Sequence, residues 1–310
     1  AQRDSEGKVI KDQSGQPGWN QDWDFSGAAN VDELAQTLRS RILIRRLKQD
    51  IGSQLPAVQR VTVPLECDLS DYKQVRKEVK KRLQEIKTEL TQRRKAWTDL
   101  SGPVRQKAIA QDAENDSLIK LYGLAGAEIA KLRKAAGLSK IKPVCEWLED
   151  FLEEETPVLL FSHHHDVQDE LVAGLNHKYN LQVPPALDGR MSMAAREKHA
   201  QGFIEKNTPV LVAGLTAMSE GFDGLQHAAC NLAFVELGWG PGVHNQAEGR
   251  LDRTGQTKPV TSYYLIATNT IDENLARIID AKGTVTSAAH GDDLPEPGIL
   301  ESLIDSIVES

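Results

Sequence analysis

Long hydrophobic runs and paired cysteines are absent from this sequence of 310 residues. No stretch approaches the roughly eighteen apolar residues that a membrane-spanning helix needs, so we expect no membrane partner. The first thirty residues are polar and show no signal peptide. The three cysteines, Cys67, Cys145 and Cys230, stand far apart. Their spacing argues against a disulfide framework and a zinc knuckle, and favours a reducing, intracellular compartment.

An excess of positive charge is also missing, since the net charge is -8 and the pI is about 5.6. Proteins that coat nucleic acid are usually basic, so the composition argues against that class. It does not exclude a protein that grips a phosphate backbone through a local patch. Aromatic residues make up only 5% and show no regular interleaving, so there is no sign of a base-stacking platform.

The organisation along the chain changes several times. The first thirty residues are rich in Gly, Ser, Asn, Gln and Asp, which predicts a flexible segment. A helix with apolar residues on one face and a β-branched strand follow. The predicted parts are a flexible segment at 1–30, a helix and strand at 31–69, a helical insertion at 70–138, an α/β lobe at 139–285, and a tail with a short helix at 286–310.

The helical insertion begins with a long basic helix predicted over residues 71–95. Val75, Val79, Leu83 and Ile86 recur at three- and four-residue steps and make an apolar stripe. The other faces carry many lysines and arginines. Such a charge run is usually a solvated face, although it could also touch DNA, and the sequence leaves both readings open.

From residue 139 onward, short apolar segments alternate with helical ones. This rhythm predicts an α/β fold with a doubly wound parallel sheet. In such sheets ligands bind at the carboxyl ends of the strands, so we expect the chemistry in the loops that follow them. The expected strands are 158–161, 185–187, 210–212, 231–235 and 260–266, and the expected helices are 143–152, 167–175, 193–203, 243–251 and 271–281.

The most informative motif runs from Gln246 to Gln256 and contains Arg250 and Arg253. On a continuing helix, residues three apart lie on one face, so we expect the two side chains to point the same way. Paired guanidiniums suit the oxygens of a triphosphate. The alternative is two surface arginines that pair with Glu248 and Asp252.

This string resembles the last motif of Swi/Snf-type ATPases in helicase superfamily two, whose pattern Q-x-x-x-R-x-x-R-x-G-Q it matches at every fixed position. Further blocks resemble the family in the same order, and the phrase Phe234-Val235-Glu236-Leu237 leans toward the annealing-helicase branch. These blocks are Arg45–Asp50 with Leu55-Pro56, Val158–Ser162, Leu187–Arg190, Thr216–Gly224 and Trp239–Pro241.

The resemblance implies a RecA-like C-terminal helicase lobe with a helical insertion, working on ATP with Mg²⁺ and on the backbone of duplex DNA. Arg250 and Arg253 would be arginine fingers, acting on phosphates held by a first RecA-like lobe. Such a protein would work in the nucleus of a eukaryote, or in the cytoplasm or nucleoid of a bacterium or phage. The resemblance also implies nucleotide-side positions at Gln246, Gly221 and Asp223, and DNA-backbone contacts at Ser162, His163, Arg190 and Thr216.

Two departures from the family limit what the resemblance implies. The loop at 219–225 reads SEGFDGL, where the family more often has two adjacent glycines and an Asn. The sequence also contains neither G-x-x-x-x-G-K-[ST] nor D-E-x-H, which belong to the first lobe. We therefore expect this chain to supply one wall of the ATP site and to have negligible ATPase activity alone.

Several alternatives stay open at this point. The chain could be a non-catalytic DNA- or protein-binding module derived from a helicase lobe, or part of an RNA helicase. A nucleotide-binding oxidoreductase is disfavoured because no G-x-G-x-x-G follows a strand. The run His163-His164-His165 could suggest a metal site, but neighbouring residues on a strand point to opposite faces, so we predict none.

Overall fold

The computed structural model describes residues 58–98, 117–216, 223–283 and 297–309. All of them belong to one compact unit, which comprises Ile51–Ser310. The flexible segment expected at 1–30, the helix expected after it, and the Arg45–Asp50 block lie outside the described residues.

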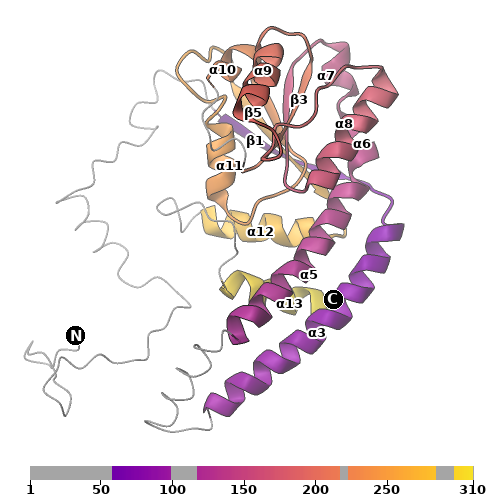
Figure 1. Ribbon diagram of the computed structural model, residues 1–310, viewed down its shortest axis with the longest axis vertical. Helices are drawn as coiled ribbons and strands as arrows, with labels where there is room; N and C mark the ends of the chain where they lie inside the picture. Colours follow the sequence, from indigo (N-terminus) through magenta and orange to yellow (C-terminus); the bar gives the residue numbers. More distant parts are fainter. Residues whose placement is uncertain (1–57, 99–116, 217–222, 284–296, 310) are drawn as a thin grey trace, which may run out of the picture. The chain divides into compact units, whose positions relative to one another are not determined.

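The centre of this unit is a five-stranded sheet in the order β1-β5-β4-β2-β3, and every neighbouring pair is parallel. Parallel strands require crossover connections, and the helices between them supply these. The predicted doubly wound α/β fold is therefore confirmed (Figure 1). The strands are β1 at Val58–Leu65, β2 at Val158–Ser162, β3 at Val210–Gly214, β4 at Asn231–Phe234 and β5 at Val260–Ala267.

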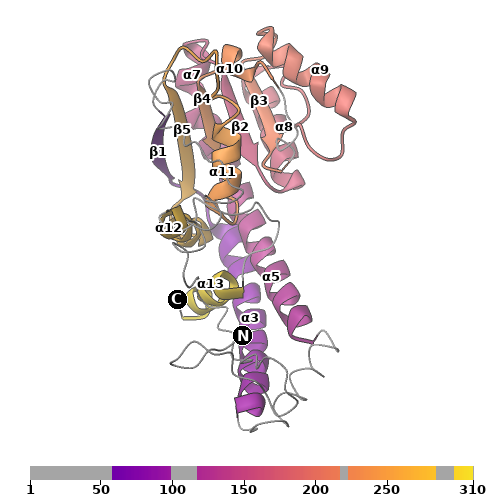
Figure 2. The same ribbon diagram turned by 90° about the vertical axis from the view of Figure 1, so that its left-hand side faces the viewer.

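Helices cover both faces of the sheet, as Figures 1 and 2 show. One face packs its apolar side chains against α6 (Ile141–Trp147) and α8 (His165–Tyr179). The strands β2, β3 and β4 are buried along their whole length, which explains their nearly continuous apolar sequences. The other face packs against α9 (Met193–Ile204), α10 (Leu225–Ala228), α11 (Pro241–Glu248) and α12 (Ile271–Gly283).

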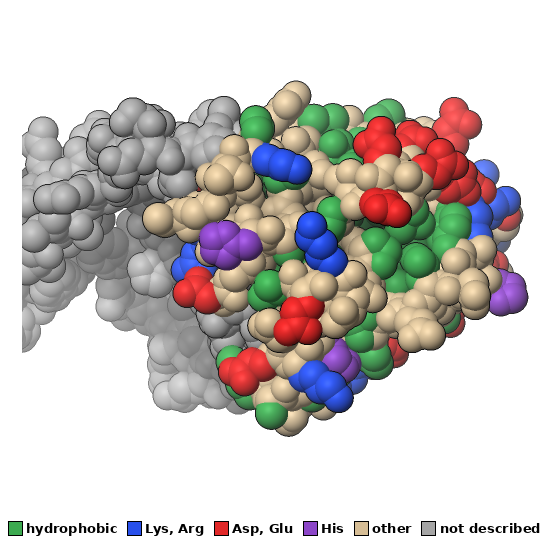
Figure 3. Space-filling model, turned by 90° about the horizontal axis from the view of Figure 1, so that it is seen from above, with side chains coloured by type: hydrophobic (Ala, Val, Ile, Leu, Met, Phe, Trp, Pro, Cys, Tyr) green, Lys and Arg blue, Asp and Glu red, His purple; other side chains and the backbone are tan. Residues whose placement is uncertain are grey.

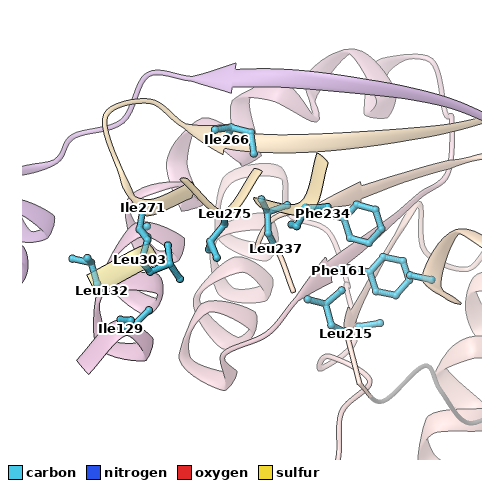
Figure 4. Close-up of a cluster of buried hydrophobic side chains, with 14 of the residues drawn as sticks. Ile129, Leu132, Phe161, Leu215, Phe234, Leu237, Ile266, Ile271, Leu275 and Leu303 are labelled. Atoms are coloured by element: carbon cyan, nitrogen blue, oxygen red, sulfur yellow. The ribbon is translucent and has the colours of Figure 1, made fainter. Parts of the chain in front are cut away.

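The helical insertion is a pair of long helices, α3 (Ser70–Thr98) and α5 (Ser117–Ser139), which lie side by side in both views. The predicted stripe on α3 faces α5, and Val79, Leu83 and Ile86 are buried. The last helix, α13 (Pro297–Glu309), contacts both. Figure 4 shows one apolar cluster that runs from Phe161 and Phe234 in the sheet to Leu303 on α13.

Two expected elements differ from the structure. The strand expected at 185–187 is reduced to a single bridge between Leu187 and Ala213, because Pro184 and Pro185 lack the N–H donors that a strand requires. The helix expected over 143–152 is interrupted at Leu148, which separates α6 from α7 (Glu149–Glu153). None of the described helices combines the length and apolar character needed to cross a membrane.

A buried ion pair joins the helical pair to the sheet. Lys140, directly after α5, is fully buried, and its Nζ donates to Asp272 Oδ2 at 2.5 Å and to the Leu265 carbonyl at 3.1 Å. Asp272 lies in the first turn of α12 and also accepts the Ala267 N–H at 3.2 Å. Three elements, α5, β5 and α12, therefore meet at one pair of charges.

Candidate functional site

The two arginines of the motif lie on a turn rather than on a helix. The helix α11 ends at Glu248, and Arg250 and Arg253 follow in a chain of tight turns. The Arg250 N–H donates to the Ala247 carbonyl and the Arg253 N–H to the Leu251 carbonyl, three and two residues back, so the α-helical pattern of hydrogen bonds is not continued. The expectation that both arginines share a helical face is wrong, and tertiary contacts on both sides of the turn explain why.

The end of the motif, Gly255-Gln256, is structural. Gln256 is buried, and its Nε2 donates to the carbonyls of Gln226 and Ala229, both at 3.0 Å. Its Oε1 accepts the N–H groups of the next two residues, each at 3.0 Å. This amide therefore fixes the turn against α10 and the start of β4, and its fixed place in the motif has a folding explanation.

Gly255 is expected to tolerate no side chain. Its φ is +97°, and a Cβ would stand 2.6 Å from His227 Cε1. Gly255→Ala should lower the free energy of unfolding by about 1–3 kcal/mol, because a non-glycine residue is strained in this region and the imidazole must move. Urea denaturation measures the change, with Gly123→Ala on α5, where a Cβ meets nothing within 4 Å, as the matched control. Equal stability of the two variants would contradict this account.

The turn brings Arg253 to Asp223, one of the three expected nucleotide-side residues. Arg253 Nη1 donates to Asp223 Oδ1 at 2.6 Å, which joins the motif to the loop that precedes α10. Burial lowers the pKa of Arg250, and the charge of Arg253 lowers it further. Gln246 is exposed on α11, and Gly221 lies outside the described residues.

The expected DNA-side residues lie around the carboxyl ends of β2 and β3. Ser162 is fully buried, and its hydroxyl donates to Glu236 Oε2 at 2.5 Å, so it faces the interior. Thr216 is exposed just after β3. His163 is half-buried, and its N–H donates to Glu236 Oε2 at 2.9 Å. Of these three, only His163 and Thr216 offer side chains to the surface.

Arg190, the fourth expected DNA contact, is exposed but held by two carboxylates. Its guanidinium forms two hydrogen bonds of 2.7 Å with Asp169, and its Nε donates to Asp188 at 2.7 Å. This fork geometry fixes the side chain in the turn after Leu187. Contact with a phosphate would require the arginine to exchange at least one carboxylate.

The two groups of expected residues lie at opposite ends of the sheet. Ser162 and Thr216 follow the carboxyl ends of their strands, whereas the arginine turn is bonded to Ala229, ahead of the amino end of β4. The arginines therefore do not lie in a loop that follows the carboxyl end of a strand. Figure 3 looks onto the amino-end face, where Lys and Arg side chains stand apart and several Asp and Glu side chains gather at one edge while others stand singly.

Sequence reasoning assigned no structural role to Glu236, which organises the loop after β2. Its carboxylate is buried and accepts hydrogen bonds from Ser162 Oγ and from the N–H groups of His163 and His164, while its Oε1 contacts His164 Nδ1 at 2.6 Å. Burial alone would raise the pKa of Glu236, but these contacts outweigh it and lower the pKa to about 2. The sequence signal for this role is a single acidic residue within the apolar segment 234–237, because a buried charge needs hydrogen-bond partners.

A buried histidine fixes the loop before α11. His244 Nε2 accepts the Gly238 N–H at 3.1 Å, and Nδ1 lies 2.9 Å from the Gly240 carbonyl. Both ring nitrogens are thus satisfied in the neutral form, with the proton on Nδ1. A second proton on Nε2 would meet the Gly238 donor. Burial therefore lowers the pKa of His244 to about 4.

Acid is expected to destabilise the lobe through His244. The unfolded state binds a proton near pH 6.5 and the folded state only near pH 4. The stability is therefore complete above pH 6.5 and is lost as the pH falls toward 4, by up to about 1.4 kcal/mol per pH unit. Urea denaturation at several pH values should show this slope and its loss in His244→Gln. His177→Gln, at an exposed position on α8, should keep the slope; a slope that survives in His244→Gln would assign it to another group.

Metal-ligating side chains do not cluster in the described part of the chain: no group of three or more His, Cys, Asp and Glu is placed to hold an ion. His164 and His165 contact Glu236 and Asp188 respectively. The histidine run thus has structural partners at the start of α8.

Known proteins from two groups are similar to this chain in sequence. The SWI/SNF-related matrix-associated actin-dependent regulator of chromatin subfamily A-like protein 1 of Xenopus laevis is 32% identical over 271 residues, covering 86% of this chain and 24% of that protein. The DNA annealing helicase and endonuclease ZRANB3 of Homo sapiens is 27% identical over 267 residues, covering 86% and 22%. The chain thus spans about a quarter of the length of these relatives. No family model matches the sequence.

The chain belongs to the Swi/Snf family. Solved structures show the same fold. The C-terminal part of the Fun30 ATPase domain aligns with a TM-score of 0.56 at 18% identity, covering 82% of this chain and 99% of that one. The Sulfolobus solfataricus SWI2/SNF2 ATPase core in complex with dsDNA aligns at 0.52 and 20% identity, covering 84% and 52%. This Swi/Snf chain is a RecA-like helicase C-terminal lobe, and the lean toward the annealing-helicase branch is confirmed.

Proposed function

We propose that this lobe is the second motor lobe of an ATP-dependent DNA translocase. One observation carries the proposal: Arg253 of the arginine turn donates to Asp223, in the loop expected on the nucleotide side. Two guanidiniums from one short turn favour a ligand with several anionic oxygens, such as a triphosphate. Gln246 and Gly221 complete the nucleotide side in this proposal.

The chemistry of ATP hydrolysis is divided between two lobes in this proposal. The first lobe, which carries the phosphate-binding loop, holds ATP and Mg²⁺. Arg250 and Arg253 then stabilise the negative charge that develops on the phosphates during transfer. This lobe alone would have negligible ATPase activity. The partners are the first lobe and duplex DNA, and the compartment is intracellular, the nucleus in a eukaryote.

The DNA contacts are proposed for the opposite end of the sheet. His163 and Thr216 are at the surface there, and Arg190 could exchange a carboxylate for a phosphate. Ser162 would act through its hydrogen bond to Glu236, by holding the loop rather than by touching DNA. Opening and closing of the two lobes would then alternate the grip on the DNA backbone.

The test is DNA-stimulated ATP hydrolysis by the full-length parent protein, wild type against Arg250→Ala and Arg253→Ala. The proposal stands if DNA stimulates turnover and each substitution abolishes it while DNA binding survives. Normal turnover in both variants would make the arginines structural. A parent protein without ATPase activity would favour the alternative, a non-catalytic module that binds DNA or protein.

A further inference from the structure

Arg60, on the first strand of the lobe, contacts the end of α11. It lies on β1 opposite Ser262 of β5. Its Nε donates to Glu248 Oε1 at 2.9 Å, and its Nη2 donates to Glu248 Oε2 at 2.6 Å and to Asn245 Oδ1 at 2.8 Å. One guanidinium therefore binds two residues on the last turn of α11, and it does so across 188 positions of sequence.

This contact is demanded by the burial of Glu248. The Glu248 side chain is 5% exposed, whereas that of Arg60 is 56% exposed. A carboxylate so deeply buried needs a cation and hydrogen-bond donors. Arg60 supplies the cation, and the Tyr264 hydroxyl donates to Oε1 at 3.1 Å. The hydrogen bond to Glu248 raises the pKa of Arg60. The sequence left open that Glu248 pairs with one of the motif arginines. In the structure its partner is Arg60.

Glu248 is also the residue from which the arginine turn begins. Its carbonyl accepts the N–H groups of Leu251 at 3.0 Å and Asp252 at 2.9 Å. Leu251 is fully buried and anchors the middle of the turn. The side chain of Glu248 therefore ties the last residue of α11 to β1, and its main chain ties the same residue to the turn. A shift of this one residue would move Arg250 and Arg253 together.

We infer that Arg60 is a positioning residue for the arginine turn: through the buried carboxylate of Glu248 it holds Arg250 and Arg253 in the arrangement that the ATP phosphates require. The inference rests on the proposed function of the two arginines. Arg60 touches neither of them and binds no nucleotide in this account. Displacement of a catalytic group by about 1 Å can cost on the order of 100-fold in rate, so the loss of such a brace is expected to lower kcat.

The rival account is that the pair only stabilises the fold. Arg60→Met alone cannot decide, because it leaves a buried carboxylate without its cation. Arg60→Met with Glu248→Gln removes both charges and keeps an acceptor for Tyr264, so the thermal midpoint should return toward that of the wild type. If Arg60 is a positioning residue, this double variant keeps a low kcat at a normal thermal midpoint.

The experiment measures DNA-stimulated ATP hydrolysis and the thermal midpoint of the full-length protein. The double variant is expected to lose about 10- to 100-fold in kcat with a small change in KM for ATP. Arg60→Lys keeps the positive charge but not the planar set of N–H donors, so its kcat should lie between those of the double variant and the wild type. Arg277→Met, which removes a guanidinium that is 74% exposed on α12, is the control and should leave both measurements unchanged.

The Arg253→Ala background separates the possible failures. Because Arg60 acts through the arginine turn and only Arg250 is left to be misplaced, adding Arg60→Met and Glu248→Gln to Arg253→Ala should lower kcat by less than the same two substitutions do in the wild type. A full additional loss there, or wild-type kcat in the stable double variant, would overturn this inference and leave the proposed function intact. Wild-type kcat in Arg253→Ala itself would overturn the proposed function, and this inference with it.

Discussion

Arg253→Ala is expected to lower the DNA-stimulated kcat of the full-length protein on the order of 1000-fold. An arginine finger acts on charge that develops only during phosphoryl transfer, and removing one costs that magnitude or more. KM for ATP and the affinity for duplex DNA should change much less, because the interaction is made in the transition state. Steady-state hydrolysis at saturating DNA, together with a DNA-binding titration, measures both.

Asp223→Ala is the matched variant for this result. It removes the other half of the ion pair of 2.6 Å but keeps the guanidinium. Both side chains are partly exposed, at 36% and 87%, so the pair itself adds little stability. A finger therefore predicts a far smaller loss for Asp223→Ala than for Arg253→Ala. Equal losses would show that the ion pair matters and the guanidinium does not reach the phosphates.

Lys140→Met is expected to destabilise the lobe by about 3–5 kcal/mol. The substitution leaves the Asp272 carboxylate buried, with the Ala267 N–H still donating to it but without its cation. It also removes the donor to the Leu265 carbonyl. Urea denaturation followed by circular dichroism measures the change, and Lys142→Met is the neighbouring control, since Lys142 is 86% exposed and its ion pair with Glu146 spans 3.9 Å.

A double variant shows whether the destabilisation comes from the unpaired Asp272 charge or from lost packing. Lys140→Met combined with Asp272→Asn removes both charges, so it should be considerably more stable than Lys140→Met alone. If the pair of substitutions is as damaging as the single one, the cost arises from packing at the junction of α5, β5 and α12. In that case the account of a stranded carboxylate is incorrect.

The sheet and the helical pair could be predicted because their signals are local. Four of the five strands expected after residue 139 appear within two residues at each end, since continuous apolar runs between helical segments have few other structures available. The stripe through Val79, Leu83 and Ile86 is also a local signal, because residues three and four apart share one face of a helix, and these three are buried. Family resemblance added the arginine motif, and its assignment to the nucleotide stays a prediction.

The turn at Arg250 could not be predicted, because its causes lie far away in sequence. Helical periodicity continues past Glu248, yet Arg60 binds its carboxylate and Gln256 ties the following residues to α10. Arg60 stands in the segment at 31–69, which the sequence predicts as a helix and a strand outside the α/β lobe. Pairing with β5 makes that segment part of the sheet, and only the strand register reveals it.

That register also constrains how the protein can be made. Val58 pairs with Val260 and Leu65 with Ala267, so β1 can pair only after β5 has been synthesised. While a ribosome synthesises the intervening chain, β1 has no neighbour, and its N–H and C=O groups remain open to other chains. Long-range parallel pairing of this kind slows folding and exposes the nascent chain to aggregation. The lobe is therefore expected to fold late and as a unit, and a nascent chain halted before β5 would be a natural client for a chaperone.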